Sequence, residues 1–258
     1  MTETLNWDHT VADVTDLPAA IDYFNSKGLR FIAGGKHEAW GTEDARDYFG
    51  LNYLELITVA NPERAHSFTY ENNSNIFTAV EDYFNGLQRF TTIAIRTNDI
   101  AATRQRLQEL GLEVGEIING ERLTPTGNLI QWQMFCVNGE LTHYLPAPFF
   151  IQWGRDDDSR RENLKNQGII KFHPAGELFV KRAIFHVTDP QEAAKQWSAI
   201  LQSEVTREGK DFIVTLGDKE LKFEHGDENR LFKLIYHGAK ESQQLRLGQI
   251  RLDLEKEK

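Results

Sequence analysis

The chain has 258 residues, which is enough for one compact architecture of repeated modules around a substantial core. Hydrophobic residues make up 40% and charged residues 26%, which excludes a disordered chain and leaves ample charge for a hydrated surface. The formal net charge of -10 argues against nucleic-acid binding, since that function needs clustered Lys and Arg, and no segment approaches the roughly 20 apolar residues of a membrane span.

A unit of strand, Asp and amphipathic helix occurs three times, in residues 7–31, 90–114 and 180–205. Asp16, Asp99 and Asp189 stand where a helix N-cap is needed, because a short carboxylate accepts hydrogen bonds from the unpaired amides of the first turn. Gly28 and Gly111 follow the first two helices at the same distance and are typical of helix C-termini. The third unit has Leu201 at that point and is the most diverged.

Strand-like segments follow each predicted helix. They are expected at about 30–36, 45–50 and 53–60, then at 113–122, 128–137 and 148–153, and finally at 204–208, 211–217, 220–225, 231–237 and 245–253. The pattern predicts an α+β fold of repeated βαβββ modules, which form a cupped mixed or antiparallel sheet with the helices outside. Residues 1–88 form the first module plus a connecting helix, and 89–154 form the second module and complete the cup. Residues 155–177 are the best linker candidate, and 178–258 form the third, diverged module.

The first strand of each unit has one apolar and one polar face, because alternate residues of a strand point to opposite sides. The apolar face, assigned beneath the helices, carries Ala12, Val14, Ile93, Ile95, Phe185 and Val187. The opposite face carries His9, Thr92 and Arg182 at equivalent positions. In the segment 53–59, both faces carry apolar residues, so Glu55 is expected to be partly desolvated. It then needs a cation, a metal or a hydrogen-bond donor, or it is a buried structural carboxylate.

The segment GGKHEAWGT at 34–42 combines glycines with side chains suited to a binding site. His37 offers a proton carrier, Trp40 a stacking surface and Thr42 a hydroxyl. The alternative is an ordinary turn whose histidine faces the solvent. Because loops carried on a scaffold often hold function, we favour a site. His143 is expected at the mouth of the cup.

Several segments resemble the glyoxalase-like domain family of the vicinal oxygen chelate superfamily. They are WDHTVADV at the start of the first module, GGKHEAWGT, YLELITV at 53–59, LPAPFFIQWG at 145–154 and HPAG at 173–176. The resemblance covers about two thirds of the chain. It implies paired βαβββ modules whose cup holds a divalent metal, here zinc, manganese, nickel or iron.

The resemblance also implies where the metal ligands lie, on the first and last strands of the two modules. Carried onto this chain, these positions are His9, Glu55, Thr92 and either Phe150 or Gln152. His9, Glu55 and Gln152 are the metal ligands that we expect, since imidazole, carboxylate and amide oxygen coordinate divalent ions. Thr92 departs from the pattern.

Two functions are compatible with these residues. In the first, the metal is a Lewis acid for a small oxygen-rich substrate, Glu55 or His37 moves a proton, and the reaction is that of a lyase, isomerase, dioxygenase or hydrolase. The expected substrate-binding residues are Trp40, Thr42, Phe150 and Trp153. In the second, the cup has lost its metal and binds or sequesters a small apolar molecule. The sequence leaves open whether the protein is an enzyme.

Signatures of other common catalytic classes do not occur, since the chain has no GxSxG, Walker A or HExxH motif and no sign of a nucleotide cofactor. Cys136 is the only cysteine, so no intrachain disulfide can form and a cytoplasmic location is expected. It lies in a strand-like segment, where a packing thiol is the simplest interpretation. The expected partner is a small molecule, and the superfamily resemblance implies a homodimer.

Overall fold

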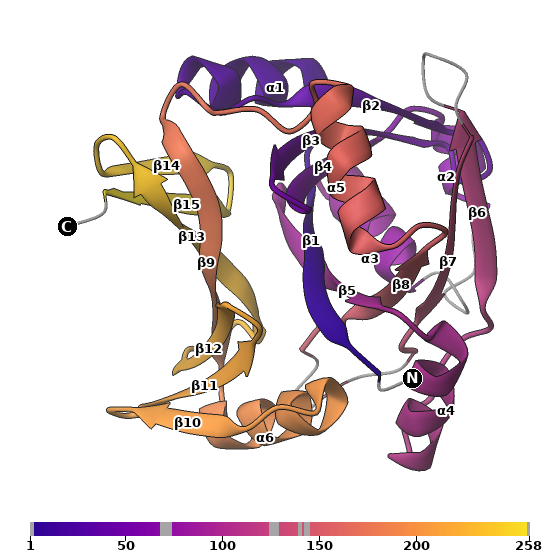
Figure 1. Ribbon diagram of the computed structural model, residues 1–258, viewed down its shortest axis with the longest axis vertical. Coiled ribbons are helices and arrows are strands. Elements are labelled where there is room, and N and C mark those ends of the chain that lie inside the picture. Colours follow the sequence, from indigo (N-terminus) through magenta and orange to yellow (C-terminus); the bar gives the residue numbers. More distant parts are fainter. Residues whose placement is uncertain (1–2, 68–73, 124–128, 139–140, 142–144, 257–258) are drawn as a thin grey trace.

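Two curved sheets lie against each other in the computed structural model, which describes residues 3–67, 74–123, 129–138, 141 and 145–256 (Figure 1). The first sheet contains β1 (Leu5–Asp13), β2 (Ile32–His37), β3 (Thr42–Phe49), β4 (Asn52–Val59), β5 (Arg89–Thr97), β6 (Ile118–Leu123), β7 (Leu129–Cys136) and β8 (Phe149–Trp153). Their order across the sheet is β2-β3-β4-β1-β5-β8-β7-β6. The two βαβββ modules therefore meet where β1 pairs antiparallel with β5, which confirms the predicted α+β cup.

The second sheet repeats this plan in residues 176–256. It contains β9 (Gly176–Val187), β10 (Val205–Glu208), β11 (Asp211–Leu216), β12 (Lys219–His225), β13 (Arg230–Ala239), β14 (Gln243–Leu247) and β15 (Ile250–Lys256). The order is β10-β11-β12-β9-β13-β15-β14, with β9 parallel to β12 and β13 parallel to β15, as β1 and β5 are parallel to β4 and β8. The third unit is thus followed by a shortened fourth. Within it, the single strand expected at 245–253 is two strands joined at Gly248, whose φ is +56°.

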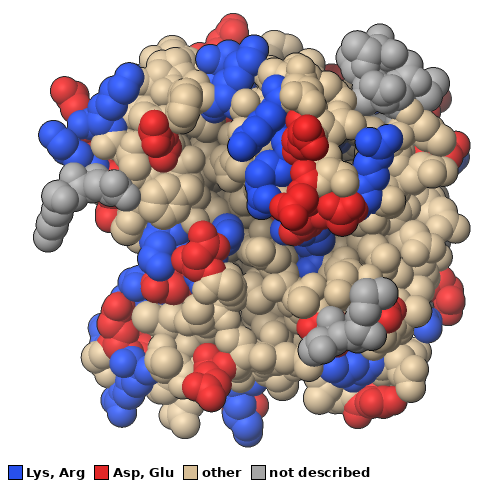
Figure 2. Space-filling model, viewed as in Figure 1, with Lys and Arg blue, Asp and Glu red and all other residues tan. Residues whose placement is uncertain are grey.

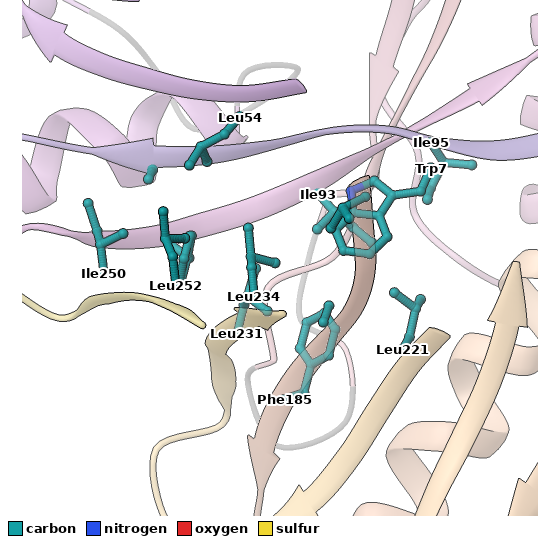
Figure 3. Close-up of a cluster of buried hydrophobic side chains, with 14 of the residues drawn as sticks. Trp7, Leu54, Ile93, Ile95, Phe185, Leu221, Leu231, Leu234, Ile250 and Leu252 are labelled. Atoms are coloured by element: carbon teal, nitrogen blue, oxygen red, sulfur yellow. The ribbon is translucent and has the colours of Figure 1, made fainter. Parts of the chain in front are cut away.

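The main core fills the space between the two sheets. Figure 3 shows Trp7, Leu54, Ile93 and Ile95 of the first sheet facing side chains of the second, namely Phe185, Leu221, Leu231, Leu234, Ile250 and Leu252. All ten side chains are almost completely buried. The apolar strand face that we assigned beneath the helices therefore packs mainly against the other sheet. Side chains of the helices α1, α4 and α6 complete the same core.

These three helices begin as predicted. They are α1 (Leu17–Ser26), α4 (Ile100–Glu109) and α6 (Pro190–Leu201). The carboxylates of Asp16, Asp99 and Asp189 each accept a hydrogen bond from the amide three residues ahead, which confirms the N-caps. Gly28 and Gly111 follow the first two helices with φ of +90° and +81°. In the third unit, the left-handed position falls on Gln202 instead.

In the described part of the chain, the connections between the units contain the helices α2 (Pro62–Ala65), α3 (Ser74–Phe84) and α5 (Asp157–Asn166). The helix α3 packs on the concave face of the first sheet, against β1, β4 and β5. Residues 68–73 of the first connection lie outside the described part of the chain.

The segment 155–177, expected as a linker, includes α5 because Asp156 caps its first turn and Leu164 packs against Tyr48, Leu51 and Tyr53. Figure 2 shows charged side chains of both signs gathered where Figure 1 places α5. Among the described helices, none is long and apolar enough to cross a bilayer.

Candidate functional site

The concave face of the first sheet holds a cavity of about 70 Å³. Its lining is largely apolar, with a few polar groups near the middle. The lining residues are His9, Val11, His37, Trp40, Arg46, Tyr53, Glu55, Ile57, Ala79, Trp132, Met134, Phe149, Ile151 and Trp153. A wider hollow of about 530 Å³ between the hairpin β2–β3 and the strands β6–β7 shares five of these residues and forms the entrance. Such a concave apolar site with few polar groups is typical of small-molecule binding.

His9 and Glu55 lie side by side in the cavity, as predicted from the polar strand faces. They come from the parallel neighbours β1 and β4, where Val11 pairs with Glu55. The Nε2 atom of His9 is 3.5 Å from Oε2 of Glu55. The imidazole ring is 3% exposed and stacks on Tyr53 at a centroid distance of 4.3 Å, while Phe149 meets its edge at 5.3 Å. The packing therefore holds the ring in one orientation.

Asp8 determines which nitrogen of His9 carries the proton. Its Oδ1 lies 2.8 Å from Nδ1 of His9, and its Oδ2 accepts hydrogen bonds from Arg96, Arg160 and the indole of Trp153. Burial alone would raise the pKa of Asp8, but Arg160, His9 and Arg96 hold it well below its ordinary value. An ionised carboxylate only accepts, so Nδ1 donates and the lone pair of Nε2 is directed at Glu55. Burial also lowers the pKa of His9, which keeps the imidazole neutral.

Glu55 is shared between two neighbours. Its Oε1 accepts a hydrogen bond from Nε of Arg46 at 3.3 Å, while Oε2 faces His9. Burial, and then the nearby carboxylate of Asp44, raises the pKa of Glu55 to about 8, although Arg46 acts in the opposite direction. Strand alternation explains this cluster, since Asp44 and Arg46 are two residues apart on β3 and both point into the cup.

The predicted hairpin site is formed by β2, β3 and the turn between them. Nδ1 of His37 is 3.0 Å from the hydroxyl of Thr42, and Nε2 is 3.5 Å from Oδ1 of Asp44. Trp40 meets the His37 ring edge-on and lines both the cavity and its entrance. Gly34 is required by a neighbour inside the fold, because a Cβ atom there would clash with the Asp44 carboxylate.

Gln152 and Phe150 are not brought into the cavity, which corrects the ligand set predicted above. On β8, the residues that face the cavity are Phe149, Ile151 and Trp153, so the two residues between them point to the opposite side of the sheet. The Gln152 side chain accepts a hydrogen bond from the amide of Ile100 at 2.7 Å, at the start of α4. Phe150 is fully buried in the main core.

The second module contributes no ligand from the two positions that correspond to His9 and Glu55. Thr92 corresponds to His9, and its hydroxyl donates to the carbonyl of Ala147. Phe149 corresponds to Glu55, because Ala94 pairs with it as Val11 pairs with Glu55. His143 lies outside the described residues.

In the second sheet, the corresponding positions carry cations. Arg182 lies where the first module has His9, and it pairs with Glu208 and Glu220. Lys222 lies where the first module has Glu55, since it pairs in register with Ile184, and it contacts Glu208, Asp211 and Glu224 at 2.8–3.0 Å. This surface of the second sheet is therefore occupied by ion pairs.

Sequence reasoning missed Asp8, Asp44 and Arg46. Asp8 is the neighbour of His9, and Asp44 and Arg46 lie beside and within the strand predicted at 45–50. A polar residue in a strand is usually exposed, so the sequence gave no distinct sign that these three side chains are buried. Here all three are at most 7% exposed. The one available signal was the alternation of Asp44 and Arg46 on a strand adjacent to YLELITV.

The donors in the cup suit a divalent cation. His9 Nε2 and Glu55 Oε2 are separated by 3.5 Å, close to the ~3.4 Å between two ligands on a tetrahedral ion with bonds near 2.1 Å. His37, Asp44 and Glu55 form a second group with ligand atoms within 4.8 Å of one another. Neither Asp44 oxygen has a hydrogen bond of ordinary geometry from the described residues, although Oδ2 pairs with Nε of Arg46. The spacing of the two donor atoms therefore suits a metal at His9 and Glu55, with Arg46 in contact with both Asp44 and Glu55.

Paired βαβββ modules thus form a cup with an imidazole and a carboxylate on its floor, which is the arrangement that the resemblance in the sequence leads us to expect. The chain belongs to the glyoxalase-like domain family, whose sequence pattern matches residues 7–201.

The solved structures support this fold. A hypothetical protein from Staphylococcus aureus aligns over 98% of this chain and 100% of its own, with a TM-score of 0.86 and 22% identity. A variant of 4-hydroxymandelate synthase from Streptomyces coelicolor aligns over 92% of this chain and 71% of its own, with a TM-score of 0.51 and 11% identity. At these identities, the likeness concerns the fold alone. Among curated proteins, none matches this chain.

Proposed function

We propose that this protein is a metal-dependent enzyme that acts on a small, oxygen-rich molecule in the cup of the first sheet. The observation that carries the proposal is the pair of His9 Nε2 and Glu55 Oε2, 3.5 Å apart in a cavity walled by aromatic side chains. A neutral imidazole and a carboxylate are strong ligands for divalent ions, and buried polar groups without a structural role are concentrated at functional sites.

His9 and Glu55 would hold the metal, in place of the set that included Gln152. Zinc, manganese, nickel or iron bound there would act as a Lewis acid toward a substrate oxygen. Asp8 keeps the lone pair of His9 directed into the cup, and Tyr53 and Phe149 hold the ring in place. Because His9 and Glu55 both line the cavity, a substrate oxygen would approach a metal held by them from the cavity.

Glu55 or His37 would move the proton of the reaction. Glu55 lies in the cavity with its second oxygen supported by Arg46. His37 lines both the cavity and the entrance, and Thr42 orients it through Nδ1. Trp40 and Trp153 would bind the apolar part of the substrate, with Phe150 supporting the sheet from behind. Such a site is compatible with the reactions of a lyase, an isomerase, a dioxygenase or a hydrolase, because one fold serves many chemistries.

The experiment is metal titration of protein purified without an affinity tag or chelator. Wild-type protein should take up one zinc, manganese, nickel or iron ion per chain. The variants His9→Ala and Glu55→Gln should each lose stoichiometric uptake while keeping a cooperative thermal transition. His225→Ala, which removes an exposed histidine, is the matched control and should bind as wild type does.

Unchanged uptake in both variants would place the metal elsewhere and reject the assignment. Absence of any uptake by the wild type would favour the alternative, a metal-free protein that binds or sequesters a small molecule. The homodimer and the cytoplasmic location remain predictions, the first of which light scattering at defined concentrations would test.

A further inference from the structure

Arg46 is a buried cation at the boundary between the cavity and its entrance. It lies on β3, is 7% exposed and lines both hollows. Its Nε pairs with the carboxylates of Asp44 and Glu55, and the guanidinium lies 5.9 Å from the centre of the Tyr53 ring. A guanidinium cannot be deprotonated in a protein, so Arg46 is a cation in this site.

The terminal nitrogens of Arg46 are not used by the described part of the fold. Within the described residues, its hydrogen bonding is limited to Nε, which donates to Glu55. Other buried arginines use their terminal nitrogens fully or in part: Nη1 and Nη2 of Arg96 donate to Asp8 and Asp157, at 2.7 and 2.6 Å, and Nη1 of Arg160 donates to Asp8. Because Arg46 lines the cavity, the N–H groups of its two terminal nitrogens are available to a ligand there.

We propose that Arg46 binds the carboxylate of a small ligand, whose apolar body lies among Trp40, Trp132 and Trp153. Two coplanar terminal nitrogens match the two oxygens of a carboxylate, so that two parallel charge-assisted hydrogen bonds can form. The three tryptophans line the cavity beside the guanidinium, and Trp40 and Trp132 also line the entrance. Glu38 and Glu121 at the entrance favour a monoanion over a more highly charged phosphate.

This inference names the ligand class of the proposed function. It rests on the cup as the ligand site but not on a bound metal. Asp44 and Glu55 position Arg46 by occupying Nε, which leaves the edge formed by its terminal nitrogens for the ligand. Arg46 is then the residue that selects acids over their neutral analogues.

The test compares two probes of the same shape, benzoate and benzamide, by calorimetric titration and by tryptophan fluorescence in buffer containing EDTA. Wild-type protein should bind benzoate at least about tenfold more tightly than benzamide. Arg46→Gln should weaken benzoate by about tenfold or more and leave benzamide unchanged. Arg207→Gln, at an exposed arginine of the second sheet, is the control and should bind both probes as wild type does.

Arg46→Lys keeps the proposal testable if Arg46→Gln leaves Asp44 unpaired and the protein unfolds. Lysine retains the charge beside Asp44 but lacks the planar pair of donors, so benzoate should still weaken, by a smaller factor. A folded variant with wild-type affinity for benzoate would overturn the proposal, as would equal wild-type affinities for the two probes or no binding of benzoate by the wild type.

The same titration separates this inference from the proposed function. Benzoate binding that depends on Arg46 in EDTA, in a protein that takes up no metal, would sustain the carboxylate site and reject the metal enzyme. The opposite outcome is benzoate binding that requires added zinc, is lost in His9→Ala and is kept in Arg46→Lys. It would support the metal enzyme and reject the carboxylate site at Arg46.

Discussion

Oδ1 of Asp8 lies 2.8 Å from Nδ1 of His9, so that adjacent residues on one strand form a buried carboxylate–imidazole pair. Successive residues of a regular strand point to opposite faces, but the register of β1 against β5 shifts between Trp7 and His9. This irregularity brings the Asp8 carboxylate to the same side as the His9 ring. A side chain that does not line the cavity thus controls the imidazole that does.

Replacing Asp8 by Asn is expected to weaken metal binding by about 10- to 100-fold, because the ring nitrogen loses a charged acceptor. The change also leaves Arg96 and Arg160 without their shared carboxylate, which should cost about 3–5 kcal/mol of unfolding free energy. Zinc titration and chemical denaturation measure the two effects. Asp157→Asn is the control, since Asp157 contacts Arg96 from the half-exposed side and does not touch His9. Equal metal affinities in all three proteins would contradict the role of Asp8.

Replacing Gln152 by Ala should leave metal uptake unchanged, because its side chain lies on the far side of the sheet from the cavity. The amide of Ile100 would lose its acceptor, which should lower the unfolding free energy by about 1 kcal/mol. Metal titration beside urea denaturation distinguishes the two effects. Loss of metal with unchanged stability would restore Gln152 to the ligand set.

The stability of the protein should fall as the pH rises from about 4 to about 7, owing to Asp13. Burial, followed by the nearby Asp82 carboxylate, raises the pKa of Asp13 to about 7, despite a hydrogen bond from the Thr91 hydroxyl. The folded state therefore holds a proton that the unfolded state releases near pH 4, and stability is lost over this interval by up to about 4 kcal/mol.

Urea denaturation at several pH values tests this expectation with Asp13→Asn, which cannot ionise and should flatten the dependence. Asp227→Asn changes an exposed carboxylate and serves as the control, with the dependence of the wild type. A dependence that stays equally steep in Asp13→Asn would assign it to other groups.

The contact between the sheets should dominate stability. Leu234 is completely buried between them, so Leu234→Ala should cost about 2–5 kcal/mol through lost burial and the cavity that remains. Leu110→Ala removes a side chain that is 48% exposed and should change stability by less than about 0.5 kcal/mol. Chemical denaturation of both variants checks the difference, and similar small losses would mean that the sheets pack weakly.

Local signals predicted the elements well, because each depends on nearby residues. The N-caps Asp16, Asp99 and Asp189 and most of the strands were predicted from spacing and alternation alone. The strand expected to begin at 113 begins at Ile118, and Val114 makes only an isolated bridge to Val137. The sequence could not predict that the apolar faces of the two sheets pack against each other. Covering helices and a second sheet are both compatible with the same pattern of apolar residues.

Parity within single strands put His9 on a polar face and Glu55 on a covered one, and the family resemblance named both as expected ligands. The structure places the two side chains together in the cavity. Gln152 was misplaced because the choice between alternate residues on β8 depends on the register with β5 and β7, which links residues far apart in the chain. Asp8, Asp44 and Arg46 were missed because several of their partners lie on other strands and helices, namely Arg96, Arg160, His37 and Glu55.

The floor of the cavity is one strand layer thick, and its other side is the main core. On β1, Val11 faces the cavity while Ala12 faces the second sheet. Any bending of this floor would open voids among the side chains shown in Figure 3, which close packing resists. Adaptation to ligands of different size must therefore come from the rim, namely the hairpin with His37 and Trp40 and the helix α3. Variants that broaden the range of accepted molecules should accordingly arise in the rim and not in the strands beneath it.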